Sequence, residues 1–362
     1  MKTSKKIISL IAGTGLLTAS FLNAATTDPV GYVTLTISGN ATNSRSFVPI
    51  AAQVYPAPLT QLSPLLITGD TMTFEGDSLT SINLSEEDSE EASIYYIEII
   101  KPENLAGQII DIVSNTSNSI VTAETSLESL LDTNSVISVR KYLQLSDVFG
   151  EANEVGLTSG QDSSTSDTVR LTESNGVLNT YYFQTDSLGF LGGTGWRKEG
   201  DVSTDHATKR ITPDQSVVVS RLPGGTTLTS IISGSVKMFE LPTPIYSGLN
   251  AVSSPFPVDV TLGESGLYTG SSDTGLKGGA NISSADVVYI YNPSDNDPSQ
   301  ARLEKYYYQI DDLGFLGGTG WRKDGDVLTD QSSKVISAST GVIISIDSNS
   351  SVTLPSPFAN VQ

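Results

Sequence analysis

The chain has 362 residues, of which 20 are Lys or Arg, 40 are Asp or Glu, one is His and none is Cys, so its formal net charge is 20 − 40 = −20. The absence of Cys excludes disulfides, thiol nucleophiles, Cys-ligated metals and lipid attachment through Cys, and a lone His excludes a two-His metal site. The acidic balance also argues against nucleic-acid binding, because contact with a phosphate backbone requires clustered Lys and Arg.

The first 24 residues have the layout of a secretory signal peptide. Lys2, Lys5 and Lys6 precede an apolar stretch over residues 7–22, and Ala24 offers a small residue for cleavage. A membrane anchor is the alternative, but the stretch is shorter than the roughly 20 residues that a span needs. Removal of residues 1–24 changes the charge to 17 − 40 = −23. We therefore expect an exported protein (extracellular, at the cell surface or in the periplasm) with no membrane span after cleavage.

Short runs of β-branched and aromatic residues dominate the rest of the chain. They are bounded by Gly, Asn, Asp, Ser or Pro, which is typical of β-strands. The clearest are residues 32–37, 94–100, 136–140, 217–221, 287–291 and 342–346. Helical patterns are confined to residues 126–131 and 145–149. The sequence predicts a mainly β protein of two or three related β-sandwich- or barrel-like modules with Gly-rich loops.

An internal repeat is the strongest signal in the sequence. Residues 181–205 (YYFQTDSLGFLGGTGWRKEGDVSTD) and 306–330 (YYYQIDDLGFLGGTGWRKDGDVLTD) are identical at 20 of 25 positions, with an offset of 125 residues. A β-branched run follows each copy, at residues 217–219 and 342–344. Repetition on this scale favours duplicated β domains, each with a Gly-rich excursion between its strands.

The repeat determines the predicted domain boundaries. After the signal peptide (1–24) we expect an N-terminal β module (25–140), a module with the first Gly-rich Trp segment (141–235) and a module with the second (236–362). The N-terminal module is interpreted as a diverged third copy, because Tyr95 and Tyr96 open it and a β-branched run closes it. The acidic run within it, residues 86–91, is interpreted as a solvated loop.

Several motifs resemble those of an uncharacterised family of secreted verrucomicrobial proteins. They are DPVGYV at 28–33, a Tyr-Tyr segment followed by AGQIIDI within 95–112, VRKYL at 139–143, LSDVFG at 145–150 and the paired Trp segments. The resemblance implies export and a repeated β-rich architecture. It implies no activity and no functional residues, since none is assigned to the family.

The sequence contains no recognisable catalytic pattern. It has no G-x-S-x-G elbow, and the Gly-rich segment 189–198 lacks both the phosphate-loop pattern and a following helix. The single His, His206, lies in a polar stretch of the first repeat, and Gln331 stands at the matching position of the second. We therefore expect His206 to be a solvent-exposed side chain rather than a catalytic base.

Acids in the turn after each Trp raise the hypothesis of a Ca²⁺ site, because closely spaced oxygen ligands suit this cation. They are Glu199, Asp201 and Asp205 in the first copy, and Asp324, Asp326 and Asp330 in the second. The same segments are typical of tight turns, which we favour. No other cofactor is expected.

The two Trp residues suggest a carbohydrate-binding site. An exposed indole can stack on a sugar ring while neighbouring Arg and Asp side chains bind its hydroxyls. The candidate ligand-binding residues are Phe190, Trp196, Arg197 and Asp201 in the first copy, and Phe315, Trp321, Arg322 and Asp326 in the second. The alternative, which we favour, is that each Trp fills the core of its module, since large aromatic side chains are mostly buried.

Three functions are open from the sequence. We favour an exported, non-enzymatic cell-surface or extracellular structural or attachment protein, whose partner is itself or an extracellular polysaccharide, because duplicated β modules occur here without a catalytic pattern. The alternatives are a carbohydrate-binding protein that uses the paired Trp segments and a secreted polysaccharide-active enzyme. With 40 acids in the chain, a carboxylate pair for glycoside hydrolysis is always available and does not discriminate between them.

Overall fold

The computed structural model describes residues 29–40, 43–173, 176–190, 192–292, 302–311, 314 and 317–358, so the predicted signal peptide lies outside the described residues. The protein is mainly β, with 41% strand and 4% helix, as the sequence predicts. Each of the six clearest strand-like runs forms a strand, and residues 145–149 form a short helix.

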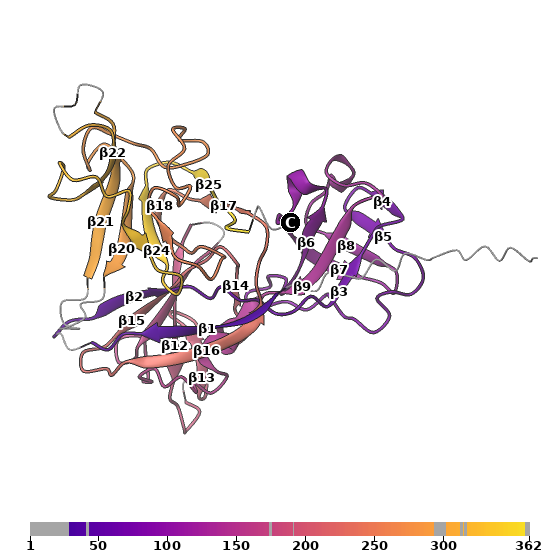
Figure 1. The fold of residues 1–362 in the computed structure, drawn as a ribbon. Coiled ribbons are helices and arrows are strands. Elements are labelled where there is room, and N and C mark those ends of the chain that lie inside the picture. Colours follow the sequence, from indigo (N-terminus) through magenta and orange to yellow (C-terminus); the bar gives the residue numbers. More distant parts are fainter. Residues whose placement is uncertain are drawn as a thin grey trace, which may run out of the picture.

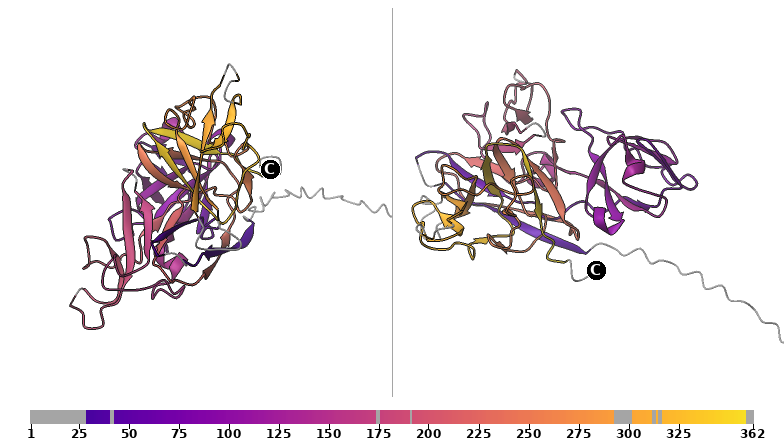
Figure 2. Two further views of the ribbon diagram at one scale, coloured as in Figure 1. Left: turned by 90° about the vertical axis from the view of Figure 1, so that its left-hand side faces the viewer. Right: turned by 90° about the horizontal axis from the view of Figure 1, so that it is seen from above.

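The strands form three modules (Figure 1). Module 1 contains residues 30–55 and 142–236, the inserted module contains residues 56–141, and module 2 contains residues 237–358. In Figure 1 the inserted module is the purple lobe on the right, module 2 is the orange and yellow part at the upper left, and module 1 lies below module 2. Seen from above, the inserted module stands beside the other two (Figure 2, right). Each module surrounds a cluster of buried apolar side chains.

Module 1 is built on a five-stranded antiparallel sheet. Its strands are, in spatial order, β13 (Gly195–Lys198), β12 (Leu178–Gln184), β11 (Thr168–Thr172), β15 (Val217–Arg221) and β2 (Ser46–Ile50). Two ribbons complete the module: β1 (Val30–Ile37) with β16 (Leu228–Ser235), and β10 (Leu143–Gln144) with β14 (Arg210–Ile211). The short helix α1 (Leu145–Phe149) follows β10.

Local sequence explains these strands. In β1, Val33, Leu35 and Ile37 face the core, while Val30 and Tyr32 face solvent, which is the period of two that a half-buried strand requires. In contrast, β15 lies between β11 and β2, and all five of its residues are buried. Its three successive Val residues fit a strand that is covered on both faces, and the buried Arg221 at its end is paired with Asp167 at 3.0 Å.

Module 2 repeats the strand order of module 1. Its five-stranded sheet runs β22 (Gly320–Lys323), β21 (Arg302–Gln309), β20 (Val287–Asn292), β24 (Val342–Ile346) and β18 (Gly248–Val252). Its ribbons are β17 (Leu241–Ile245) with β25 (Ser350–Leu354), and β19 (Val260–Thr261) with β23 (Val335–Ile336). Pro242 and Pro244 are exposed at alternate positions of β17, which pairs with β25 on one side. Because proline lacks an N–H, this is a place where a strand tolerates it.

The N-terminal strands belong to module 1, so the predicted N-terminal module 25–140 is not one unit. β1 pairs with β16 along its whole length, and β2 pairs with β15. The inserted module occupies the connection between β2 and β10, whereas the matching connection of module 2 consists of residues 253–259. The prediction failed because strand partners that are distant in sequence leave no local signal.

The inserted module is a seven-stranded sheet that curves into a half-barrel. Its spatial order is β3 (Thr60–Leu62), β9 (Val136–Lys141), β6 (Tyr95–Lys101), β7 (Ile109–Asn115), β8 (Ser119–Thr122), β5 (Thr71–Thr73) and β4 (Leu66–Thr68). Two short 3-10 helices, η1 (Glu103–Leu105) and η2 (Leu127–Ser129), lie in its loops. Five of its strands, β8, β7, β6, β9 and β3, have the same spatial order and antiparallel pairing as the five strands of modules 1 and 2, and β5 and β4 extend the sheet beyond β8. The topology therefore agrees with the interpretation as a diverged third copy, although Tyr95 and Tyr96 lie on β6, which matches β11 rather than β12.

A buried ion-pair triad connects the inserted module to the first residues of module 2. Glu98 of β6 lies 2.5 Å from Lys237 Nζ and 2.6 Å from Arg140 Nε, and each of these side chains is at most 5% exposed. Gly107 approaches the same segment so closely that a Cβ there would lie 2.2 Å from the carbonyl oxygen of Glu240. These contacts determine how the inserted module sits against the rest of the chain.

Candidate functional site

Both Trp side chains lie in module cores. Trp196 is fully buried and Trp321 is 3% exposed. Phe183 packs edge-on against Trp196 with ring centroids 5.5 Å apart, and the indole Nε1 donates a hydrogen bond to the carbonyl of Gly150 at 2.9 Å. Tyr308 packs in the same way against Trp321, at 5.6 Å. The indole faces are therefore not available for stacking on a sugar, and the alternative that each Trp fills its core is confirmed.

The Arg side chains next to the Trp residues are also buried. Arg197 Nη2 donates hydrogen bonds to the carbonyls of Gly192 and Gly193 at 2.8 and 3.1 Å, and Arg322 makes the same pair of bonds in module 2, at 2.7 and 2.9 Å. Each guanidinium satisfies carbonyls that the Gly-rich turn would otherwise leave unpaired. Arg197 and Arg322 stabilise the loops, so their predicted role as ligand-binding residues is wrong.

The acids of the two turns accept hydrogen bonds from their own loops. Oδ1 of Asp201 accepts the backbone N–H groups of Ser203 and Thr204 at 3.1 and 3.2 Å, and Oδ1 of Asp326 accepts that of Thr329 at 3.2 Å. Bonds from Thr204, and then from Ser203, lower the pKa of Asp201. Within the part of the chain that the structure describes, no group of three or more His, Asp or Glu side chains could hold a metal ion. Neither predicted Ca²⁺ set is therefore brought together as a metal site.

Phe190 lies at the tip of the Gly-rich loop of module 1, away from Trp196. Its side chain is 85% exposed, and that of Leu188 is 76% exposed. The matching residue of module 2, Phe315, lies outside the described residues. Exposed apolar side chains at a loop tip are candidates for contact with a partner. The predicted set of Phe, Trp, Arg and Asp therefore does not form one surface.

His206 is buried, contrary to the expectation of a solvated side chain. It is 2% exposed, and its Nδ1 lies 2.7 Å from Oγ of Ser89, which belongs to the inserted module. Its Nε2 lies 3.5 Å from Oδ2 of Asp201. Burial lowers the pKa of His206, so the ring is neutral at pH 7. The distance to the acid exceeds that of a good hydrogen bond, and we interpret the group as a contact between modules rather than a catalytic triad.

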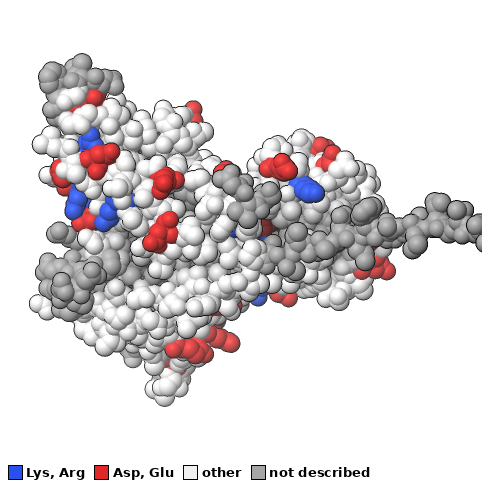
Figure 3. Space-filling model, viewed as in Figure 1, with Lys and Arg blue, Asp and Glu red and all other residues white. Residues whose placement is uncertain are grey.

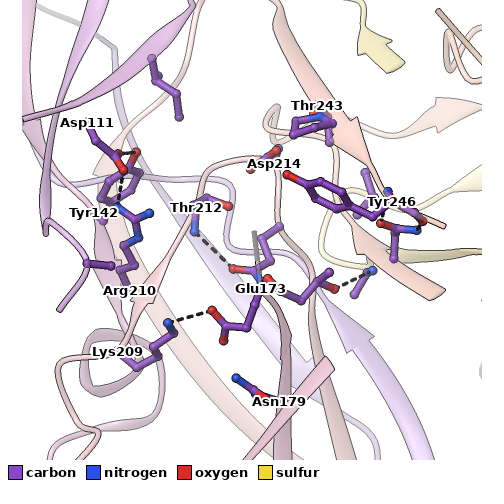
Figure 4. Close-up of a pocket in the computed structure, with 18 of the residues that line it drawn as sticks. Asp111, Tyr142, Glu173, Asn179, Lys209, Arg210, Thr212, Asp214, Thr243 and Tyr246 are labelled. Carbon is purple, nitrogen blue, oxygen red and sulfur yellow. Dashed lines mark hydrogen bonds and ion pairs between the residues drawn. The ribbon is translucent and has the colours of Figure 1, made fainter. Parts of the chain in front are cut away.

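A cleft of about 690 Å³ opens where the three modules meet (Figure 4). The inserted module contributes Glu90 and Asp111, module 1 contributes Lys209 and Asp214, and module 2 contributes Tyr246. Its remaining lining consists mainly of amide, hydroxyl and small apolar side chains. Binding sites commonly lie in clefts between domains, with a few placed polar groups on an apolar background. This cleft is the candidate functional site.

Lys209 is the centre of an ion-pair network on one wall of the cleft. Its Nζ lies 2.7 Å from Oε2 of Glu90 and 3.0 Å from Oε2 of Glu173. Lys198 binds the other oxygen of Glu90 at 2.5 Å, and the Tyr181 hydroxyl donates to both carboxylates at 3.1 Å. Burial raises the pKa of Glu90, but its bonds with the two lysines outweigh burial and lower the pKa to about 2. The network therefore stays charged at neutral pH.

A second group on the same side of the cleft is formed around Arg210. Its Nη1 lies 2.9 Å from Oδ2 of Asp111 and donates to the carbonyl of Ser93 at 2.7 Å. The Tyr142 hydroxyl donates to the other oxygen of Asp111 at 2.7 Å, and the guanidinium lies 4.9 Å from the centre of the Tyr142 ring. Figure 4 shows this group facing Asp214 and Tyr246 across the cleft.

Asp214 and Tyr246 form the other side of the cleft. Asp214 lies in the turn between β14 and β15, where burial raises the pKa of its carboxyl although contacts with Thr212, with its own backbone N–H and with Thr243 act in the opposite direction. Burial, and then the charge of Asp214, raises the pKa of Tyr246. In Figure 4 the Tyr246 side chain extends toward Asp214.

Charged side chains are scattered over the outer surface. On the face shown in Figure 3, Asp and Glu lie in small separate groups, and Lys and Arg are few apart from a mixed group on module 2. This face therefore shows no large patch of acidic or of basic side chains that would suggest a second binding site. The acidic run 86–91, interpreted from sequence as a solvated loop, instead supplies Glu90 to the cleft and Ser89 to the contact with His206.

The comparisons with known proteins give no identity. No protein family, no curated protein and no solved structure matches this chain. Among the described residues, none of the helices has the length and apolar character needed to span a lipid bilayer.

Proposed function

We propose that this is an exported, non-enzymatic extracellular attachment protein that binds a carbohydrate in the cleft between its three modules. The single observation that carries the proposal is the position and lining of that cleft, where side chains of all three modules face one space of about 690 Å³. Export rests on the N-terminal pattern of residues 1–24, and membership of the secreted family rests on the motif resemblance alone.

The lining suits a sugar better than an apolar ligand. Tyr246 offers a half-buried aromatic ring. Asn179 and Thr243 can donate and accept hydrogen bonds, and the carboxylates of the cleft can accept them. Sugar rings combine apolar faces with a rim of hydroxyls, and proteins bind them with this mixture of aromatic and planar polar side chains. The cleft also replaces the two Trp segments as the candidate carbohydrate site, because both indoles are buried.

The test is binding to a panel of soluble polysaccharides by the chain without its predicted signal peptide. Affinity electrophoresis detects retention, and released reducing ends report any hydrolysis. Tyr246→Ala should weaken the binding of a retained glycan about tenfold, because it removes the aromatic wall. Tyr32→Ala, which removes a 73% exposed tyrosine from β1, is the matched control and should bind as the native chain does. Failure to retain any glycan contradicts the proposal, and released reducing ends contradict its non-enzymatic part.

A second candidate is attachment by self-association, which the exposed Leu188 and Phe190 favour. Sedimentation velocity over a concentration series should then show oligomers that Phe190→Ser disperses. Leu66→Ser, at an exposed position of the inserted module, is the control. A native chain that stays monomeric at high concentration excludes this candidate and leaves the cleft proposal unaffected.

A further inference from the structure

We infer that the cleft contains a subsite for a primary ammonium group at Asp214, so that the carbohydrate bound there is an amino sugar whose amine is not acetylated. This inference rests on the proposed function, carbohydrate binding in the cleft, and adds the charge of the ligand.

Asp214 differs from the other carboxylates of the cleft in its lack of a cationic partner. The other three carboxylates that line the cleft each bind a Lys or Arg nitrogen at 3.0 Å or less. Asp214 forms no such ion pair with any Lys, Arg or His of the described residues, and the Lys237 charge reaches it only at longer range, because that ammonium binds Glu98. Asp214 is half-buried in the wall of the cleft. A carboxylate that is partly removed from water without a cationic partner is destabilised, and a bound cation relieves this.

The backbone holds Asp214 in place between modules 1 and 2. Its carbonyl accepts the N–H of Ser253 at 3.0 Å, and the turn is closed by a bond from the N–H of Gln215 to the carbonyl of Thr212 at 3.0 Å. Contacts with Thr212, with the backbone N–H of Asp214 itself and with Thr243 favour the charged form of the carboxyl and partly oppose the effect of burial on its pKa. A carboxylate accepts about four hydrogen bonds, so these contacts leave acceptor capacity for a ligand. The side chain is thus oriented before the ligand binds, which lowers the entropic cost of binding.

Tyr246 supplies the second element of an ammonium site. Its ring lies next to Asp214 in the cleft (Figure 4), and the Asp214 charge is close enough to raise the pKa of its hydroxyl. An aromatic ring attracts a cation through its quadrupole, and a carboxylate forms short charge-assisted hydrogen bonds with it. A single carboxylate suits the single charge of an ammonium group, whereas a divalent metal ion requires several oxygen ligands, and no such cluster exists among the described residues.

The experiment compares two hexasaccharides by titration calorimetry at a pH at which free sugar amines are protonated. The β-1,4-linked oligomers of glucosamine and of glucose differ at C2, where one carries an ammonium group and the other a hydroxyl. We expect the native chain to bind the glucosamine oligomer at least tenfold more tightly, which is the low end for a hydrogen bond with a charged group. Asp214→Asn should abolish this difference, because it removes the carboxylate that pairs with the ammonium group.

Glu128→Gln is the matched control, because it removes one negative charge from an exposed position of the inserted module and should keep the preference. Circular dichroism establishes that each variant is folded, and the comparison in the native chain needs no variant. Equal affinity for the two oligomers overturns the inference and leaves the proposed function standing. A preference that persists in Asp214→Asn also overturns it. If no glycan binds at all, the proposed function itself is contradicted.

Discussion

Glu90 of the inserted module and Glu304 of module 2 bind equivalent lysines. In module 2, Lys323 and Lys334 lie 2.6 and 3.2 Å from Glu304, which is part of the same module. In module 1 the lysines 125 positions earlier, Lys198 and Lys209, lie 2.5 and 2.7 Å from Glu90. The position 125 residues before Glu304 is Asn179, so module 1 has no carboxylate there. Lys209 binds Glu173 of its own module at 3.0 Å, but the carboxylate that joins both lysines is Glu90 of the inserted module. The lysine pair of the repeat is thereby turned into a docking contact between modules.

The acid stability of the protein should depend on these two carboxylates. Burial raises the pKa of both, but the lysine contacts, joined at Glu304 by a hydrogen bond from the Tyr306 hydroxyl, outweigh it and lower the pKa of Glu90 and of Glu304 from 4.5 to about 2. A carboxyl whose pKa is lower in the folded state stabilises the fold above its unfolded pKa, and this stabilisation is lost as the pH falls through the folded pKa. Stability to urea should therefore decrease between about pH 4.5 and pH 2.

Glu90→Gln and Glu304→Gln should each make that decrease smaller. Glu90→Gln should also expose the junction of the inserted module to proteolysis at neutral pH, whereas Glu304→Gln should not, because its lysines lie in its own module. Identical proteolysis of the two variants would contradict the docking role of Glu90.

His206→Gln should change how stability depends on pH near 6.5. Burial, the main cause, lowers the pKa of His206 below 6.5 in the folded state, although Glu90 and Asp201 raise it. The unfolded chain therefore takes up the proton first, and stability falls as the pH drops through about 6.5. Gln331 holds the matching position of module 2. Its backbone N–H donates a hydrogen bond to the carbonyl of Trp321 at 2.9 Å, just as the backbone N–H of His206 donates to the carbonyl of Trp196 at 2.9 Å. The variant should fold, and its free energy of unfolding, measured by urea denaturation, should no longer decrease as the pH falls through about 6.5. An unchanged pH dependence would contradict the buried, neutral state of His206.

Lys237→Met should destabilise the protein by about 3 kcal/mol, because it leaves the buried Glu98 with one cationic partner in place of two. The change is measured as a lower urea midpoint. Lys277→Met, which alters an exposed lysine of module 2, should cost less than about 0.5 kcal/mol. Similar losses in both variants would show that the triad does not stabilise the fold.

Trp fluorescence should be blue-shifted and protected from acrylamide, because both indoles are buried. Trp196→Ala should cost about 3–5 kcal/mol through the cavity that it leaves. Phe190→Ala, in the Gly-rich loop before β13, should change stability by less than about 0.5 kcal/mol, since its ring is 85% exposed. A large loss of stability for Phe190→Ala would contradict the exposed position.

Local patterns in the sequence predict the individual strands well. The runs at 217–221 and 342–346 match β15 and β24, and the helix at 145–149 matches α1, because side-chain period and β-branched composition are local properties. The burial of Trp196 and Trp321 also follows from a general tendency of large aromatic residues.

The candidate site could not be predicted in the same way. Glu90, Asp214 and Tyr246 belong to three different modules and meet only when these dock. His206 is buried because Ser89, 117 residues earlier, covers it. No periodicity or spacing encodes such contacts, and an acidic run such as 86–91 has the composition of a solvated loop until its partner lysines are known.

The insertion between β2 and β10 has a consequence for the way the chain reaches its fold. Val30 pairs with Ser235, which lies 235 − 30 = 205 residues away, so the ribbon of β1 and β16 is a contact of high sequence separation and is expected to form slowly. The inserted module contains all of its own strand partners, and its first and last strands, β3 and β9, pair with each other from Thr60–Val139 to Leu62–Ile137. Once this module has formed, the ends of its long segment are already close together. The loop that β2 must close to reach β15 is then shortened by the 141 − 56 + 1 = 86 residues of the inserted module, which lowers the entropic cost of closing it.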